Sequence, residues 1–132
     1  YCIVDGGLNH LNYYGQAMAM KMPHHKHIPD APLETSDEQS EEQSEVLWNI
    51  CGSLCTVNDV LVKQMPLKHA KIGDALVFER VGAYSVTEGI YLFLSRRMPR
   101  LLFWSEKDGF TEARKATESY PINTECTEKM KN

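Results

Sequence analysis

The sequence predicts a mainly β domain of about six to eight strands, with one short helix near the C-terminus. Two observations support this expectation. Short runs rich in β-branched and aromatic residues recur, as at 57–62 and 75–81. Turn-forming residues separate such runs, notably Pro66 and the Gly73-Asp74 pair. A rhythm of short strands and turns is typical of a barrel or a sandwich.

The sequence of the N-terminal part predicts strands that alternate with irregular segments. Residues 1–4 form a strand that ends at the glycine pair of 5–7, because paired glycines admit positive φ at little cost. Residues 16–22 alternate methionine with other residues and predict a half-buried strand. For 22–30, which holds three histidines and two prolines, we expect a solvated loop that its prolines keep out of regular pairing. A metal site there is less favoured, since such close neighbours converge only in a sharply bent loop.

The stretch 30–45 is acidic throughout. It contains seven Asp and Glu residues, no Lys or Arg, one leucine and no aromatic residue. So little apolar surface cannot offset the entropy cost of ordering, and we expect a mobile surface insertion between strands. A weak helix over 38–45 and an acidic docking segment are less favoured alternatives.

The remainder of the chain is predicted to add further strands and one helix. Apolar runs predict strands at 46–51, 60–65, 75–81, 90–94 and 101–104. Pro66 should end the second of these, and 85–88 should form a polar bend. Asp108-Gly109 marks a turn, and 111–116 predicts a short helix capped by Thr111. We expect the polar tail, 121–132, to fray.

Length and composition limit the classes of function that the sequence allows. At 132 residues the chain is one domain that can bury a core without metals or disulfides. Its 14 Lys and Arg against 18 Asp and Glu give a net charge of −4, which disfavours nucleic acid as a partner. No apolar run reaches the roughly 18 residues of a membrane span. Four cysteines without metal-finger spacing and no visible signal peptide favour reduced thiols in the cytoplasm.

Four short motifs follow one another through the centre of the chain. They are Gly-Ser-Leu-Cys at 52–55, Asp-Val-Leu at 59–61, Ile-Gly-Asp at 72–74 and Gly-Ala-Tyr at 82–84. A fifth, Asp-Gly-Gly-Leu-Asn, lies at 5–9. In order and spacing they resemble the C-terminal β-domain of the pyridoxal-phosphate-dependent ornithine, diaminopimelate and arginine decarboxylases, which are built on an alanine-racemase-like barrel. This resemblance implies a Greek-key-like β-barrel.

The resemblance also implies a domain organisation. Residues 1–120 would be the C-terminal β-barrel domain, with 30–45 as its insertion and 121–132 as the tail. The abrupt start at Tyr1 suggests that an upstream part, the N-terminal β/α barrel, is missing. Family knowledge places the catalytic lysine and most phosphate-binding glycines there. We therefore expect this chain to be inactive alone, and the intact protein to be an amino-acid decarboxylase that acts as a homodimer with shared active sites.

Two side chains are the main candidates for the chemistry. Cys55 is similar in position to the family cysteine that reaches the neighbouring subunit's active site, where a thiol can protonate the substrate carbon after decarboxylation. Tyr84 is similar to the tyrosine that donates its hydroxyl to the cofactor phosphate, while Gly82 and Ala83 let the backbone approach closely. An inert cysteine and a half-buried barrel tyrosine are the alternatives.

Other positions bear on the substrate. Thr56 stands where many members carry an acid that contacts the distal amine of the substrate. Asp59 matches a landmark aspartate, and we favour a role in capping the loop that presents Cys55 over direct substrate contact. The candidates to line a different pocket are Asn12, Tyr13, Tyr14 and Glu88. The arginine expected after the Asp-Gly-Gly-Leu-Asn motif, which clamps a substrate carboxylate, is absent, and this weakens diaminopimelate as the substrate.

Two other functions stay open at this stage. A decarboxylase-like protein that has lost its substrate groups would act only by binding a partner. An amino-acid racemase of the alanine-racemase kind pairs a similar barrel with a β-domain, although the Gly-x-x-Cys motif argues against it.

Overall fold

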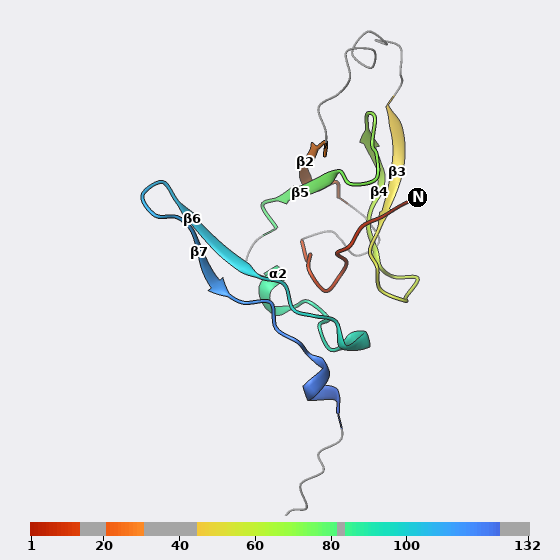
Figure 1. Cartoon of the computed structure of the whole chain (residues 1–132). Helices are drawn as coiled ribbons and strands as arrows, with labels where there is room; N and C mark the ends of the chain where they lie inside the picture. Colours follow the sequence, from red (N-terminus) through yellow and green to blue (C-terminus); the bar gives the residue numbers. More distant parts are fainter. Residues whose placement is uncertain (14–20, 31–44, 82–83, 125–132) are drawn as a thin grey trace, which may run out of the picture.

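The computed structural model describes residues 1–13, 21–30, 45–81 and 84–124. Within these ranges seven strands form three small sheets (Figure 1). Residues 31–44 of the predicted insertion lie outside the described residues, as do 16–20 of the predicted strand at 16–22 and the tail beyond residue 124. The expectation of a mainly β chain is confirmed. The described strands leave all three sheets open and do not close into a barrel.

The largest sheet contains three strands in the order β1-β3-β4. They are β1 at Cys2–Ile3, β3 at Val46–Cys51 and β4 at Val60–Leu67. β1 is parallel to β3, and β3 is antiparallel to β4. The ladder between β3 and β4 is irregular beyond Trp48, where the Asn49 side chain accepts a hydrogen bond from the backbone N–H of Gln64 at 3.1 Å. Gln64 has a positive φ of 55°, which is consistent with a β-bulge.

The strand predicted at 46–51 is confirmed, whereas the one predicted at 60–65 is longer than expected. β4 continues through Pro66, which lies opposite Leu47. β4 is an edge strand of its sheet, and proline, which lacks a backbone N–H, is tolerated at such an edge.

The second sheet corrects the loop predicted at 22–30. There β2, His24–Ile28, pairs antiparallel with β5, Ala75–Glu79. The loop prediction was wrong because Pro23 precedes the paired run and Pro29 follows it, so neither proline interrupts the ladder.

The C-terminal part contains a short helix, two 3-10 turns and a hairpin. They are α2 at Tyr84–Thr87, η2 at Phe93–Ser95, β6 at Leu101–Ser105, β7 at Gly109–Arg114 and η3 at Tyr120–Asn123. The strand predicted at 101–104 and the turn at 108–109 are confirmed. The strand predicted at 90–94 and the helix predicted at 111–116 are wrong, and the bend expected at 85–88 is largely α2.

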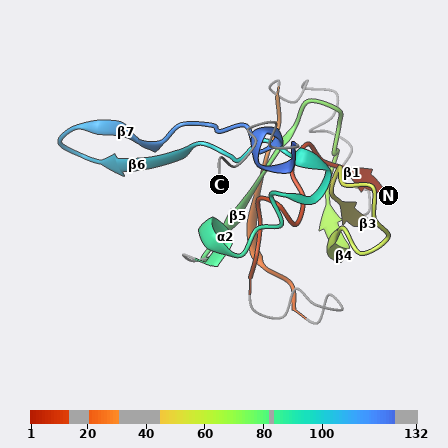
Figure 2. The same ribbon diagram turned by 90° about the horizontal axis from the view of Figure 1, so that it is seen from below.

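The hairpin pairing explains why 111–116 is not a helix. Trp104 lies directly opposite Phe110, and Phe103 lies opposite Thr111. Cross-strand pairs of aromatic and β-branched residues stabilise a ladder, and here they override the local helix preference. The hairpin extends away from the other two sheets (Figures 1 and 2).

The core lies against the largest sheet. Its buried members come from the N-terminal segment, β3 and β4: Leu11, Ile50, Leu61, Val62, Met65 and Leu67. Leu76 and Phe78 of β5 pack against them, so the second sheet contributes to the same core.

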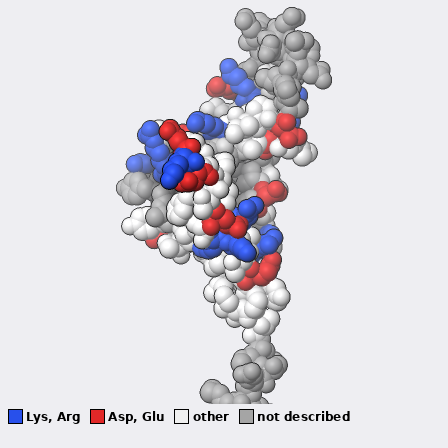
Figure 3. All heavy atoms as spheres, turned by 60° about the vertical axis from the view of Figure 1, so that its left-hand side comes forward, with Lys and Arg blue, Asp and Glu red and all other residues white. Residues whose placement is uncertain are grey.

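The surface has no single dominant charge on the face that Figure 3 shows. Basic and acidic side chains are interspersed there. On the surface Arg97 pairs with Glu118 at 3.1 Å, and Arg100 pairs with Glu112 at 2.9 Å. Among the described residues, no helix has the length and apolar character needed to cross a membrane.

Candidate functional site

The loop that joins β3 to β4, residues 52–59, carries Cys55 and is built around one carboxylate; we call it the thiol loop. The Asp59 side chain is only 3% exposed. Its Oδ1 accepts a hydrogen bond from the backbone N–H of Leu8 at 2.9 Å, and its Oδ2 accepts one from Leu54 at 2.8 Å. Because backbone N–H groups satisfy this buried carboxylate from two directions, Asp59 fixes the loop to the N-terminal segment.

Two motif glycines make room for this carboxylate. A Cβ atom on Gly52 would lie 2.1 Å from Asp59 Oδ2, and one on Gly7 would lie 2.6 Å from the same oxygen. Both distances are far below a van der Waals contact. Only glycine lets the backbone at these two positions come this close to the Asp59 carboxylate, so the two glycines and Asp59 pack together as one unit.

The thiol loop also rests on the turn at 5–7. The backbone N–H of Ser53 donates to the carbonyl of Gly6 at 2.9 Å, and the Ser53 hydroxyl donates to the carbonyl of Asp5 at the same distance. The N–H of Gly52 donates to the Asp59 carbonyl at 2.9 Å and closes the base of the loop. Two motifs that are far apart in the sequence thus form one structure.

Cys55 lies at the outer side of this loop. Its side chain is exposed, and its thiol is free. Thr56 beside it is partly buried, and its N–H donates to the Leu54 carbonyl at 2.8 Å. The loop therefore presents a solvent-accessible thiol from a backbone that is held on its inner side.

Tyr84 begins α2 and has a side chain that is 68% exposed. The Tyr91 hydroxyl lies 2.9 Å from the carbonyls of both Ser85 and Val86, and so caps this short helix. The helix thus holds Tyr84 at the surface, where its phenol can donate a hydrogen bond to an outside group. Gly82 and Ala83 lie outside the described residues.

Asn12 connects α2 to the rest of the domain through both its backbone and its side chain. The backbone N–H of Asn12 donates to the Ser85 hydroxyl at 2.9 Å, and that hydroxyl donates to the Asn12 carbonyl at 2.8 Å. The Asn12 amide donates to Glu88 at 2.7 Å. In the structure, Glu88 therefore helps to hold α2 in place.

Tyr13 is also part of the framework. Its hydroxyl donates to the carbonyl of Leu61, and its ring packs against the core. Burial raises the pKa of the Tyr13 phenol, which keeps it a neutral donor at physiological pH. Tyr14 lies outside the described residues.

Two residues that the sequence did not indicate also contact or surround the thiol loop. The Arg96 guanidinium donates a hydrogen bond to the Ser53 carbonyl. Burial and, second, the positive charge of Arg96 lower the pKa of the His10 imidazole, which favours the neutral ring. Arg96 is 43 residues from Ser53 in the sequence, so no local motif could have revealed this contact.

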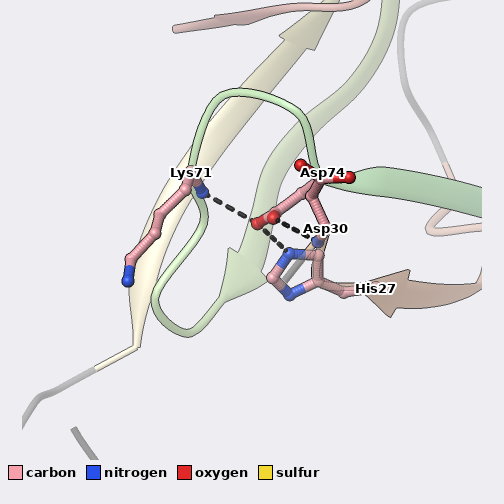
Figure 4. Close-up of polar contacts among 4 residues, drawn as sticks. All are labelled: His27, Asp30, Lys71 and Asp74. Atoms are coloured by element: carbon pink, nitrogen blue, oxygen red, sulfur yellow. Dashed lines mark hydrogen bonds and ion pairs between the residues drawn. The ribbon is translucent and has the colours of Figure 1, made fainter. Parts of the chain in front are cut away.

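The three histidines of β2 do not gather. Alternation along the strand leaves His24 exposed, whereas His25 and His27 are partly buried. His27 Nε2 lies 2.7 Å from Asp74 Oδ2, and that carboxylate also accepts hydrogen bonds from the backbone N–H groups of Lys71 and Asp30 (Figure 4). In the described part of the chain no three His, Cys, Asp or Glu side chains come together as metal ligands would.

Comparisons with known proteins agree with this arrangement. A family model described as the pyridoxal-dependent decarboxylase C-terminal sheet domain matches residues 1–82. A comparison with curated proteins gave no match.

Solved structures of diaminopimelate decarboxylases share the fold. One of them is 22% identical to this chain, with a TM-score of 0.70. The match covers 91% of this chain and 28% of the chain in that structure. The enzyme from Helicobacter pylori, complexed with L-lysine, is 22% identical with a TM-score of 0.64, covering 91% and 26%. That from M. jannaschii, also in complex with L-lysine, is 24% identical with a TM-score of 0.63, covering 86% and 23%.

The chain thus spans only about a quarter of the length of these structures. The matched residues include the thiol loop, the glycine turn and Asp59. The chain therefore belongs to the pyridoxal-dependent decarboxylases, whose C-terminal sheet domain it matches.

Proposed function

We propose that this chain is the C-terminal domain of a pyridoxal-phosphate-dependent decarboxylase of amino acids. The observation that supports it best is the exposed Cys55 on a loop that the buried Asp59 holds in place. In this proposal residues 1–120 are the domain, 30–45 an insertion and 121–132 a tail. A preceding β/α barrel of the same polypeptide supplies the catalytic lysine.

Tyr84 fits one part of a pyridoxal phosphate site. Its exposed phenol is a hydrogen-bond donor that can reach a phosphate presented by another domain. We assign Gly82 and Ala83 to the close approach of the backbone there. The cofactor, when bound, accepts the electron pair that the departing carboxylate leaves behind. Since the catalytic lysine is proposed to lie on the preceding barrel, this chain is proposed to be inactive by itself.

Cys55 is proposed as the proton donor. After carbon dioxide has left, the Sγ–H bond would break and the proton would pass to the substrate carbon, where the electron pair that the cofactor had accepted forms the new C–H bond, leaving a thiolate. The thiolate then takes a proton from water, to which the exposed side chain has access. We propose that Cys55 acts in the active site of a second subunit, so that the intact protein is a homodimer, and that it works in the cytoplasm.

The other candidate positions contribute in two ways. Asp59 is buried with both oxygens engaged, so its contribution is proposed to be indirect, through the loop. Thr56 is the neighbour of Cys55 and is proposed to contact the distal part of the substrate. Tyr13 and Glu88 hold the framework, and with Tyr14 they are proposed only to shape the pocket wall.

The substrate class is proposed to be a basic amino acid. Two of the structural neighbours are described in complex with L-lysine. Thr56 is uncharged where many members carry an acid, so the amino acid preferred by this protein need not be diaminopimelate. A carboxylated polyamine is a further candidate substrate.

The test is carbon dioxide release by the full-length protein with pyridoxal phosphate, across basic amino acids in both configurations and carboxylated polyamines. Release from one substrate class would support the proposal and identify that class. Racemised substrate without carbon dioxide would point to a racemase instead. Neither product, with no change in the cofactor absorbance on adding any substrate, would favour a non-catalytic binding protein.

A further inference from the structure

The peptide units on either side of residue 53 are held from opposite directions. Ser53 donates its N–H to Gly6, and Leu54 donates its N–H to Asp59. The carbonyl between these two N–H groups, that of Ser53, accepts from the Arg96 guanidinium. Leu54, which contributes the N–H of the same peptide, is only 6% exposed. This Ser53–Leu54 peptide is followed directly by the Leu54–Cys55 peptide, so fixing it restrains the backbone that carries the thiol.

Arg96 is itself fixed by a buried serine. The Ser119 hydroxyl is 2.7 Å from the Arg96 carbonyl and 3.1 Å from the Tyr91 carbonyl, and Ser119 is 0% exposed. A buried hydroxyl shared between two carbonyls restrains both backbone segments. The C-terminal segment therefore holds the backbone of Arg96 while its side chain reaches the thiol loop.

The Arg96 guanidinium can support the thiol loop through a charge-assisted hydrogen bond. The His10 imidazole interacts electrostatically with both Arg96 and Asp59, and burial together with the Arg96 charge lowers the pKa of His10 and favours the neutral ring. A hydrogen bond from a charged donor is stronger than a neutral one. Arg97, next in the sequence, instead has a side chain that is 63% exposed and pairs with Glu118 at the surface. Arg96 therefore contacts the thiol loop, whereas Arg97 forms a surface ion pair.

We propose that Arg96 is a positioning residue for the Cys55 thiol, acting through the Ser53 carbonyl. Arg96 lies beyond residues 1–82, the part that the family model matches, so the C-terminal segment contributes to the active-site loop. This inference rests on the proposed function, because it takes Cys55 as the proton donor.

The first test is hydrogen exchange in the full-length protein. In Arg96→Met, the amides of 53 and 54 should exchange about tenfold faster, as expected for loss of one charge-assisted hydrogen bond. Arg97→Met is the matched control and should leave them unchanged. Arg96→Lys keeps the charge without the planar fork and should give a smaller increase; it also carries the test if the methionine variant does not fold. Unchanged exchange in both Arg96 variants would overturn the inference.

The second test separates positioning from general stability. Arg96→Met should lower kcat about tenfold with KM within twofold, because the thiol is displaced while substrate binding is kept. In a Cys55→Ala background the same substitution should lower kcat less than twofold further, since the displaced group is already gone. Equal losses in both backgrounds would overturn the inference. A fully active Cys55→Ala enzyme would instead refute the proposed function, whereas the exchange data report on the Arg96 contact independently.

Discussion

At the scale of single residues, the Asp59 carboxylate is the organising group. It accepts two backbone hydrogen bonds while almost fully buried. In Asp59→Asn one of the two N–H groups, of Leu8 or Leu54, would face an amide NH2 group. We expect the free energy of unfolding to fall by about 2 kcal/mol, the cost of one lost charged hydrogen bond at a buried site.

Urea denaturation measures this change. Asp108→Asn is the matched control, because Asp108 is an exposed turn residue, and its unfolding free energy should stay within about 0.5 kcal/mol. An Asp59→Asn chain as stable as the control would contradict the role given to this carboxylate.

The glycine at 52 gives a second prediction at this scale. Gly52→Ala places a methyl group 2.1 Å from Asp59 Oδ2, so either the loop or the carboxylate must shift. We expect a loss of about 3 kcal/mol in unfolding free energy, at the upper end for overpacking. Gly109→Ala is the comparison, because a Cβ atom at this position would have no neighbour within 4 Å. The unfolding free energy should fall by only about 1 kcal/mol, the cost of a positive φ in a residue other than glycine. Equal losses in thermal or urea unfolding would argue against the steric explanation.

The sequence predicted part of this cluster. The motif order at 5–9, 52–55 and 59 indicated a loop that presents Cys55, with Asp59 as its cap. It could not reveal which N–H groups meet the carboxylate, because Leu8 is 51 residues away from Asp59. Arg96 was missed for the same reason: its contact depends on how the C-terminal segment folds back, and no local pattern records this.

At the scale of elements, the Asp74 cluster connects the β2–β5 sheet to its turn. Hydrogen bonds from the backbone of Lys71 and Asp30, and then from His27, lower the pKa of the Asp74 carboxyl from 3.8 to about 2. The folded state therefore binds this proton less readily than the unfolded state. The contribution of Asp74 to stability is complete above about pH 4 and is lost as the pH falls toward 2.

This gives a prediction for acid unfolding. Between about pH 5 and pH 2, the unfolding free energy of the wild-type chain should fall more than that of Asp74→Asn, whose side chain does not titrate. Urea midpoints across that range measure the difference, with Asp108→Asn as an exposed control that should follow the wild type. Parallel pH profiles for Asp74→Asn and the wild type would contradict the prediction.

The elements themselves were predicted unevenly. The strand at 46–51 was correct because five of its six residues are apolar and Asn49 is its one polar residue. Residues 22–30 were misassigned because the prolines were weighed by number and not by position, although they only flank β2. The segment 111–116 was taken for a helix because local propensity cannot detect the Trp104 and Phe103 partners across the hairpin.

At the scale of the whole molecule, one packed core holds two exposed candidate side chains, Cys55 and Tyr84. The open sheets hold one core, the N-terminal segment connects the thiol loop to α2, and both Cys55 and Tyr84 point outward. The exposure of both candidate groups fits the proposal that this domain completes a site on a larger protein. Its mainly β character was predictable from strand rhythm, whereas the open sheets depend on pairings between distant strands.

The most direct test of this account is the steady-state kinetics of Cys55→Ala and Cys55→Ser in the full-length protein, with the substrate that releases most carbon dioxide. The account predicts that kcat falls by about 100-fold or more in Cys55→Ala, the usual contribution of a general acid, while KM changes little. Cys55→Ser should recover little activity, because a hydroxyl gives up its proton less readily than a thiol. A kcat within twofold of the wild type in Cys55→Ala would contradict the central claim that the thiol loop presents a proton donor.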